Sequence, residues 1–231
     1  MTLKLDIRGP IVVLVAEFNS AIFQPPWIAK HLFGKAEGDE MAAAEILIQN
    51  GPLLIQLTFL EGVAINVAPN RTEIFALDAE PETLARAEGV LLKMLEVLPH
   101  TPLAAVGCNL SYVDDDPSTA IAELFTTPEG FEAEGVLNSR QSGVQLQLEG
   151  EQVLNFVRLL GPKEARYSFN YHRAESDAER YKNFVPGMIA KAREDSETLL
   201  KSLYGYEGCD VIGFVAGNQQ EGNGDDSQTT H

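Results

Sequence analysis

The hydrophobic and polar positions of this chain form a pattern of strands and helices that occurs twice. Ile11 to Phe18 is an apolar, β-branched run typical of a strand that is buried on at least one face. Pro25-Pro26 then open a short helix that runs to Phe33, because proline is tolerated in the first helical turn. The same order recurs from Leu103, where the strand-like run to Val113 is followed by a short helix from Ser118 to Phe125.

Alternating apolar and polar residues predict strands after each short helix. In the first half the segments are Ala43 to Gln49, Leu53 to Phe59, Gly62 to Val67 and Arg71 to Leu77. In the second half they are Gly135 to Ser139, Val144 to Leu148, Val153 to Leu159 and Ala165 to Tyr171. Asn50-Gly51 accepts the positive φ angles of a tight hairpin and therefore joins the first two.

A longer amphipathic helix closes each half. Pro81 to Leu98 carries one apolar stripe, and Pro186 to Tyr204 ends at Gly205, a residue suited to a helix terminus. The residues expected to face inward on the second helix are Ile189, Ala192, Leu199 and Leu203. Both helices need a buried surface, so we expect them to cover a sheet.

Short matches between the halves keep the same order along the chain. Leu32-Phe33 corresponds to Leu124-Phe125, and Ala64 to Val67 corresponds to Val153 to Phe156. This order predicts one pseudo-duplicated domain over residues 1–216, with halves 1–101 and 102–206 and a short extension 207–216. The alternative is two unrelated α+β halves with similar periodicity. Residues 217–231 lack large apolar side chains and are predicted to be a disordered tail.

The predicted fold class is α+β, with a duplicated β-α-β-β-β-β-α unit, a curved, mainly antiparallel sheet and helices on one face. This order resembles the duplicated halves of the TATA-binding-protein fold, which implies a saddle with its helices on the convex side. The resemblance is one of topology over about residues 10 to 205 and rests on no signature residues, so it implies no shared function. Residues 174–183 have no counterpart in the first half, and they are either a functional loop or a helix extension.

If the apolar phase of each strand faces the helices, the other face is rich in amides and hydroxyls. Its predicted members are Gln56, Thr58, Asn66, Asn109, Ser111, Gln147, Asn155, Ser168, Asn170 and His172. Six of these, Asn66, Asn109, Ser111, Asn155, Asn170 and His172, form the candidate face for a ligand or partner. Such a surface lacks the Lys and Arg that a phosphate backbone requires, so direct nucleic-acid binding is not expected.

The net charge of −17 adds a field that repels phosphate. Seven acids and no Lys or Arg occur between Tyr112 and Ser139, beginning with Asp114-Asp115-Asp116. This run is either a solvated acidic edge or a surface that docks a basic partner or imitates nucleic-acid charge.

No motif for nucleotide binding, an activated nucleophile or a metal site is present in the sequence. Cys108 and Cys209 are predicted to be reduced thiols, and the histidines have no metal-ligand spacing. Asp114-Asp115-Asp116 is best explained as a polar link and helix cap. His172 with Asn170 and Ser168 is the nearest approach to a polar cluster. We therefore expect no catalytic residue, cofactor or metal.

The leading hypothesis is a non-enzymatic, cytoplasmic binding protein whose partner is another protein. The alternatives are an acidic inhibitor that mimics nucleic acid, and a small-molecule binding protein or enzyme that uses the open face near His172. The longest apolar run is too short for a membrane span, and the N-terminal run predicts a strand and not a signal peptide. Two unpaired sheet edges would allow homodimerisation.

Overall fold

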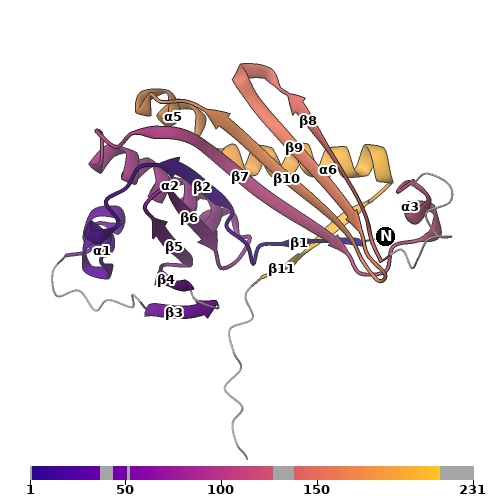
Figure 1. Cartoon of the computed structure of the whole chain (residues 1–231), viewed down its shortest axis with the longest axis horizontal. Coiled ribbons are helices and arrows are strands. Elements are labelled where there is room, and N and C mark those ends of the chain that lie inside the picture. Colours follow the sequence, from indigo (N-terminus) through magenta and orange to yellow (C-terminus); the bar gives the residue numbers. More distant parts are fainter. Residues whose placement is uncertain (1, 37–43, 51–52, 127–137, 214–231) are drawn as a thin grey trace, which may run out of the picture.

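The computed structural model describes residues 2–36, 44–50, 53–126 and 138–213, with side chains for 3–36, 61–126 and 138–213. The described chain is a mixed α+β protein built on one large, open and mainly antiparallel sheet (Figure 1). The strands are β1 (Thr2–Asp6), β2 (Val12–Ala16), β3 (Ala44–Asn50), β4 (Leu53–Leu60), β5 (Val63–Ala68), β6 (Arg71–Ala76), β7 (Leu103–Asp114), β8 (Arg140–Gln147), β9 (Gln152–Leu160), β10 (Ala165–Ala174) and β11 (Gly208–Ile212). The helices are α1 (Pro25–Phe33), α2 (Pro81–Val97), α3 (Thr119–Glu123), α5 (Ala178–Phe184) and α6 (Met188–Tyr204), with short 3-10 turns at Ser20–Ile22 and Glu149–Glu151.

Neighbouring strands follow the order β3-β4-β5-β6-β2-β7-β10-β9-β8. The two halves of the sequence meet where β2 pairs antiparallel with β7, in a register that places Leu14 opposite Val106. Beyond Val12, where β2 begins, the same edge of β7 pairs with β1 through Lys4 and Leu5. The C-terminal strand β11 then pairs parallel with β1, so both ends of the described chain lie together.

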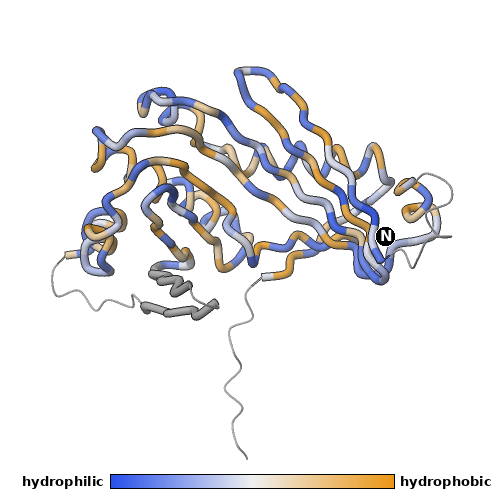
Figure 2. The backbone as a smooth tube through the Cα atoms, in the orientation of Figure 1, coloured by the Kyte–Doolittle hydropathy of each residue, from blue (hydrophilic) through white to orange (hydrophobic). Residues whose placement is uncertain are grey.

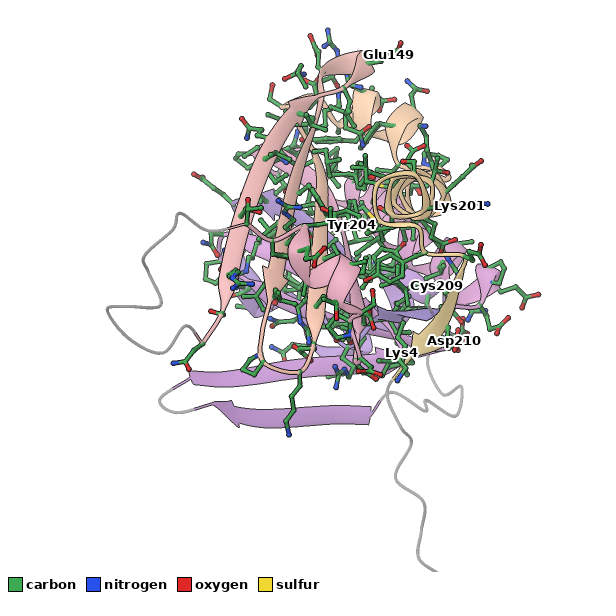
Figure 3. All side chains as sticks on the ribbon, turned by 90° about the vertical axis from the view of Figure 1, so that its right-hand side faces the viewer. Lys4, Glu149, Lys201, Tyr204, Cys209 and Asp210 are labelled. Atoms are coloured by element: carbon green, nitrogen blue, oxygen red, sulfur yellow. The ribbon has the colours of Figure 1, made fainter. Side chains whose placement is uncertain are left out.

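The alternation of apolar and polar residues along the strands determines which face of the sheet is buried (Figure 2). On β10, Tyr167, Phe169 and Tyr171 are buried, whereas the residues between them are only partly buried. Figure 3 shows α6 on one side of the long strands, with side chains filling the space between them. Tyr171 Oη and Ser196 Oγ are 3.1 Å apart in this layer, which ties β10 to α6.

Glu88, on α2, fixes how the two long helices meet. Its buried carboxylate accepts the backbone N–H groups of Gly187 at 2.7 Å and Ile189 at 2.8 Å. These N–H groups lie at the start of α6, where no earlier helical turn can supply an acceptor. The first half of the chain therefore caps the final helix of the second half.

Most of the strands and helices predicted from the periodicity are present in the structure. The predicted and observed bounds of these elements are close. Helix α6 ends at Tyr204, and its C-terminal cap Gly205 has a φ of 73°, the left-handed conformation expected there. Within residues 174–183, the part from Ala178 onward lies in α5, which is a separate short helix and not the predicted extension of α6, because residues 185–187 separate the two. The predicted strand Gly135 to Ser139 falls mainly outside the described residues, as do Gly51 of the predicted hairpin and the tail 217–231.

Two details of the sequence interpretation are wrong. Leu203 was expected to face inward on α6 but is 61% exposed, because the buried stripe passes through Ser196 and Leu200. The N-terminal strand β1 was not predicted, since its five residues alternate too briefly to give a clear signal.

Trp27 is partly buried and packs between Phe23 and His31, with ring centroids 5.0 and 4.8 Å away. None of the described helices is both long and apolar enough to cross a bilayer.

Candidate binding site on the open face of the sheet

The face of the sheet turned away from α2 and α6, here called the open face, carries rows of polar side chains that run across the strands. In one row, Asn170 of β10 lies between Asn155 of β9 and Asn109 of β7. In the next row, Ser168 lies opposite Ser111. These residues meet because the strands pair in register and side chains of equal phase share a face.

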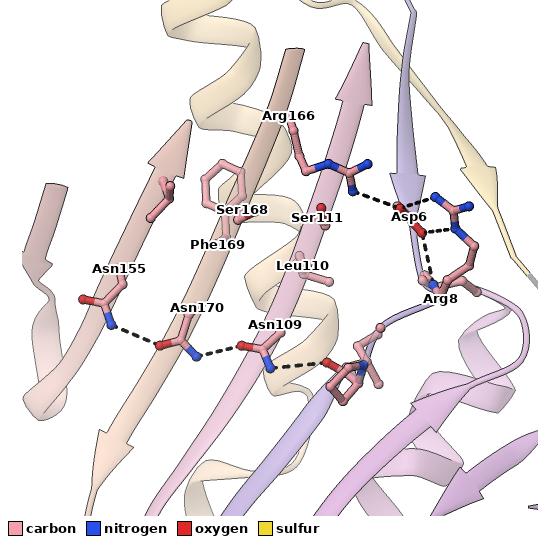
Figure 4. A pocket seen from close by; sticks show the side chains of 15 residues that line it. Asp6, Arg8, Asn109, Leu110, Ser111, Asn155, Arg166, Ser168, Phe169 and Asn170 are labelled. Carbon is pink, nitrogen blue, oxygen red and sulfur yellow. Dashed lines mark hydrogen bonds and ion pairs between the residues drawn. The ribbon is translucent and has the colours of Figure 1, made fainter. Parts of the chain in front are cut away.

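The three asparagines form a continuous chain of hydrogen bonds, here called the amide ladder (Figure 4). Asn155 Nδ2 donates to Asn170 Oδ1 at 3.1 Å, and Asn170 Nδ2 donates to Asn109 Oδ1 at 2.7 Å. Asn109 Nδ2 then donates to the backbone carbonyl of Pro10 at 3.3 Å. At the other end, Gln145 of β8 donates to Asn155 Oδ1 at 2.9 Å. The ladder thus joins β8, β9, β10 and β7 to the segment before β2.

The carbonyl of Pro10 gives the amide ladder a fixed direction. A carbonyl accepts only, so Asn109 must present its NH2 group to Pro10 and its oxygen to Asn170. The same requirement then orients Asn170 and Asn155 in turn. Asn155 Nδ2 also lies 3.4 Å from His172 Nδ1, which therefore acts as the acceptor. The direction of each amide follows from its neighbours.

Gly107 of β7 leaves room for the ladder. It pairs with His172, and a Cβ atom added there would come within 3.2 Å of Asn170 Nδ2 and 3.4 Å of His172 Cβ. A side chain at position 107 would therefore require the amide of Asn170 to shift by a few tenths of an ångström. The absence of a side chain at Gly107 therefore leaves the amide of Asn170 in its place in the ladder.

A hollow of about 680 Å³ lies beside the ladder on the open face. Residues Ile7 to Ile11, which connect β1 to β2, form one wall, and the open-face residues of β7, β9 and β10 form the floor. Ser111 and Ser168 contribute to this floor, and Val157 adds an apolar patch. The volume lies within the range usual for ligand sites, about 300 to 1,000 Å³.

Two arginines and one aspartate form the charged end of the hollow. Arg8 binds Asp6 through Nε at 2.7 Å and through Nη2 at 2.6 Å, and Arg166 Nη1 reaches the same carboxylate at 3.1 Å (Figure 4). Hydrogen bonds from Arg8, aided by Arg166, lower the pKa of Asp6 to about 2 although burial of the carboxylate opposes this. The side chain of Asp6 is only 7% exposed, whereas that of Arg8 is 53% exposed.

The structure brings together only part of the predicted candidate face. Asn109, Ser111, Asn155 and Asn170 line the hollow, as does Ser168. His172 is attached to the ladder through Asn155 but is not among the lining residues. Asn66 lies apart, on β5, where its amide donates to Glu73 at 2.9 Å.

The other polar residues expected on this face have different positions. Gln147 donates to the carbonyl of Gln152 at 3.2 Å, at the turn between β8 and β9. Gln56 and Thr58 are on β4, whose side chains are outside the described set. Sequence reasoning missed Asp6, Arg8 and Arg166, because nothing in the sequence shows that β1 returns to lie beside β7.

The acidic run that begins at Asp114 is only partly a surface feature. Asp114 is buried and accepts a hydrogen bond from Tyr206 at 2.8 Å, while Tyr167 and Tyr206 are joined at 3.1 Å. Burial raises the pKa of Tyr167 to about 12, so this tyrosine is protonated at neutral pH. Asp115 pairs with Lys4. Residues 127–137 lie outside the described chain, so the rest of the run is not placed.

The described residues hold no cluster of three or more His, Cys, Asp or Glu side chains arranged to bind a metal ion. Cys108 is buried and Cys209 is half-buried. Burial raises the pKa of the Cys209 thiol to about 11, which keeps it protonated at neutral pH.

Comparisons with protein families, with curated proteins and with solved structures each gave no match for this chain. What the open face does must therefore be inferred from its own geometry.

Proposed function

We propose that this chain is a non-enzymatic binding protein that holds a short segment of a partner protein on the open face of its sheet. The observation that carries the proposal is the amide ladder beside a hollow of about 680 Å³. An amide side chain has the same donor and acceptor groups as a peptide bond, so a row of them suits a polypeptide backbone. Domains that bind a peptide along a sheet edge likewise combine main-chain hydrogen bonds with side-chain pockets.

The polar groups of the hollow support binding more than catalysis. Ser111 and Ser168 are hydroxyls on the floor, and within the described residues neither is hydrogen-bonded to a base that would activate it. The nearby histidine, His172, faces Asn155. The ladder holds its amides in place before any ligand arrives, which lowers the entropy cost of binding.

We further infer that halves 1–101 and 102–206 are copies of one unit within a single domain, with the topology of the TATA-binding-protein fold. Leu14 and Val106, which face each other in the β2–β7 pair, are 92 residues apart, as are the matching Leu-Phe pairs of the two short helices. Moving outward from this pair, β6, β5 and β4 correspond in order to β10, β9 and β8. Superposing these strands in an experimental structure tests the idea, and long helices packed against different strands would contradict it.

Blocking the floor of the hollow tests the binding proposal. Ser168→Leu adds bulk at its centre, whereas Ser202→Leu makes the same change at an exposed position on α6. Fluorescence anisotropy of a dye-labelled pool of randomised pentapeptides measures binding to each variant. We expect wild type and Ser202→Leu to bind the pool and Ser168→Leu to lose at least tenfold in affinity. Equal binding by both variants, or none by the wild type, would refute the proposed function.

A further inference from the structure

The charged end of the hollow has one more positive charge than negative charge. Among its described lining residues, Arg8 and Arg166 are cationic and Asp6 is the single acid. Arg8 uses Nε and Nη2 for Asp6, so its Nη1 group is not engaged there. Glu164, which is not one of the lining residues, pairs with Arg166 at 3.4 Å, and the two side chains are 42% and 33% exposed, so water screens part of that pair. Among the lining residues alone, one unit of positive charge therefore faces the hollow, and Glu164 offsets part of it from outside.

The overall charge of −17 does not cancel this local excess. At physiological salt, charges farther than about 8 Å are largely screened, whereas a guanidinium in direct contact with a ligand is not. Asp6 also holds both guanidinium groups at the hollow, because one buried carboxylate binds the two of them. The excess charge is positioned before a ligand arrives.

The remaining polar groups of the hollow are mainly donors. Pro10 fixes the direction of the ladder, and each of Asn109 and Asn170 spends only one of its two N–H bonds on it. The Ser111 and Ser168 hydroxyls have no hydrogen-bond partner among the described residues. A complementary ligand therefore presents acceptor oxygens to the floor and a single negative charge to the arginines.

We propose that the hollow recognises the C-terminal end of a polypeptide. Its terminal carboxylate lies by Arg8 and Arg166, and the carbonyl oxygens before it accept from Ser111, Ser168 and the ladder. A chain end fits better than a segment that runs through, because residues Ile7 to Ile11 close one side of the hollow. A single carboxylate also matches the single excess charge better than a doubly charged phosphate does. This inference rests on the proposed function and specifies which part of the partner is held.

Two peptide pools that differ only at the C-terminus test the inference. Both are randomised pentapeptides with an N-terminal fluorescein, one with a free carboxylate and one amidated, and fluorescence anisotropy gives their affinities. We expect the acid pool to bind at least tenfold more tightly. Arg8→Gln should remove about ten- to hundredfold of that affinity, as expected for a lost charged hydrogen bond. Arg180→Gln changes an exposed arginine, which pairs with Glu175, by the same charge elsewhere on the protein and should leave binding unchanged.

A second variant tests the inference even if Arg8→Gln fails to fold. Ser111→Ala leaves the Asp6 pairs intact and should weaken binding of the acid pool by about two- to tenfold. Equal affinity for the acid and amide pools would overturn the inference while leaving the proposed function standing. Failure of both pools to bind would overturn both. Inorganic phosphate displacing the acid pool more effectively than N-acetylglycine would also overturn it, since it would identify a phosphate site.

Discussion

At the scale of single residues, Glu88 shows how one buried side chain can join distant parts of the chain. Its carboxylate accepts two backbone N–H groups at the start of α6, from residues about a hundred positions further along. No periodicity in the sequence points to this role, because a Glu on an amphipathic helix is ordinarily assigned to the solvated face. The sequence predicted both helices, but the contact between them depends on a tertiary arrangement.

Glu88→Ala should lower the free energy of unfolding by about 2–3 kcal/mol, because it removes two charge-assisted hydrogen bonds at a helix N-terminus. Chemical denaturation monitored by circular dichroism measures the loss. Glu194→Ala, at an exposed position on α6, is the matched control and should change stability by less than about 0.5 kcal/mol. Similar small losses for both variants would show that Glu88 does not cap the helix.

Asp6 predicts a defined dependence of stability on pH. Its pKa in the folded protein is about 2, against 3.8 for an ordinary aspartate. The unfolded chain therefore takes up the proton first, so the stabilisation is complete above about pH 4 and is lost as the pH falls towards 2. The shift corresponds to at most ~2.5 kcal/mol, and solvent screening around the exposed guanidinium of Arg8 reduces the expected value to ~1 kcal/mol.

Measuring unfolding of wild type and Asp6→Asn between pH 2 and pH 6 tests this expectation. The difference in stability between them should be constant at the upper end and should shrink as the pH approaches 2. Glu194→Gln serves as the control, with no such convergence expected. A difference that persists unchanged at pH 2 would mean that ionisation of Asp6 contributes nothing to folding.

At the scale of elements, period-two patterning was sufficient to predict the open face but not the site built on it. The pattern predicted that Asn109, Asn155 and Asn170 share one side of their strands, since phase within a strand is a local property, and in the structure hydrogen bonds join the three side chains. That the three meet in one row depends on the registers between strands. Those registers follow from turns and packing far away in sequence. For the same reason, the sequence did not predict that β1 and Arg8, which follows it, lie beside this face.

The amide ladder should strengthen the second half of the sheet. Asn170→Ala breaks two of its bonds and is expected to cost about 1–2 kcal/mol in unfolding free energy. Asn66→Ala on β5, which removes a single hydrogen bond to Glu73 on β6, is the control and should cost less than about 1 kcal/mol. In nuclear magnetic resonance spectra, Asn170→Ala should also shift the side-chain amide signals of Asn109 and Asn155. Unmoved signals would show that the ladder does not persist in solution.

At the scale of the whole molecule, the sequence predicted the mixed α+β fold class that the structure has, but it did not predict that the two ends of the described chain pair with each other. The short strands β1 and β11 pair with each other although they lie at opposite ends of the described residues. Neither is long enough to give a clear pattern, although Leu3 and Leu5 of β1 are buried in the core. Nonlocal pairing of this kind brings Arg8 to the hollow, so the charged end of the site is a property of the complete fold.

The net charge of −17 predicts that salt will stabilise the protein. Raising NaCl from about 10 to about 150 mM shortens the Debye length from ~30 to ~8 Å, which screens repulsion between distant carboxylates. The same salt weakens exposed pairs such as Lys191–Asp195, but each of these contributes only about 0–1 kcal/mol. We expect the net effect to be a gain of about 1 kcal/mol, or about 2–4 °C in the melting temperature of a chain of this size.

A variant that removes charge without added salt separates this effect from specific ion binding. Glu123, Glu194 and Glu207 are exposed. Changing all three to Gln should raise the melting temperature in low salt and reduce the response to NaCl, because less repulsion then remains to be screened. Differential scanning calorimetry of both proteins across the salt series measures the two responses. A melting temperature that falls as salt is added would mean that the surface ion pairs outweigh the repulsion, and the acidic surface would then have to be regarded as a stabilising network.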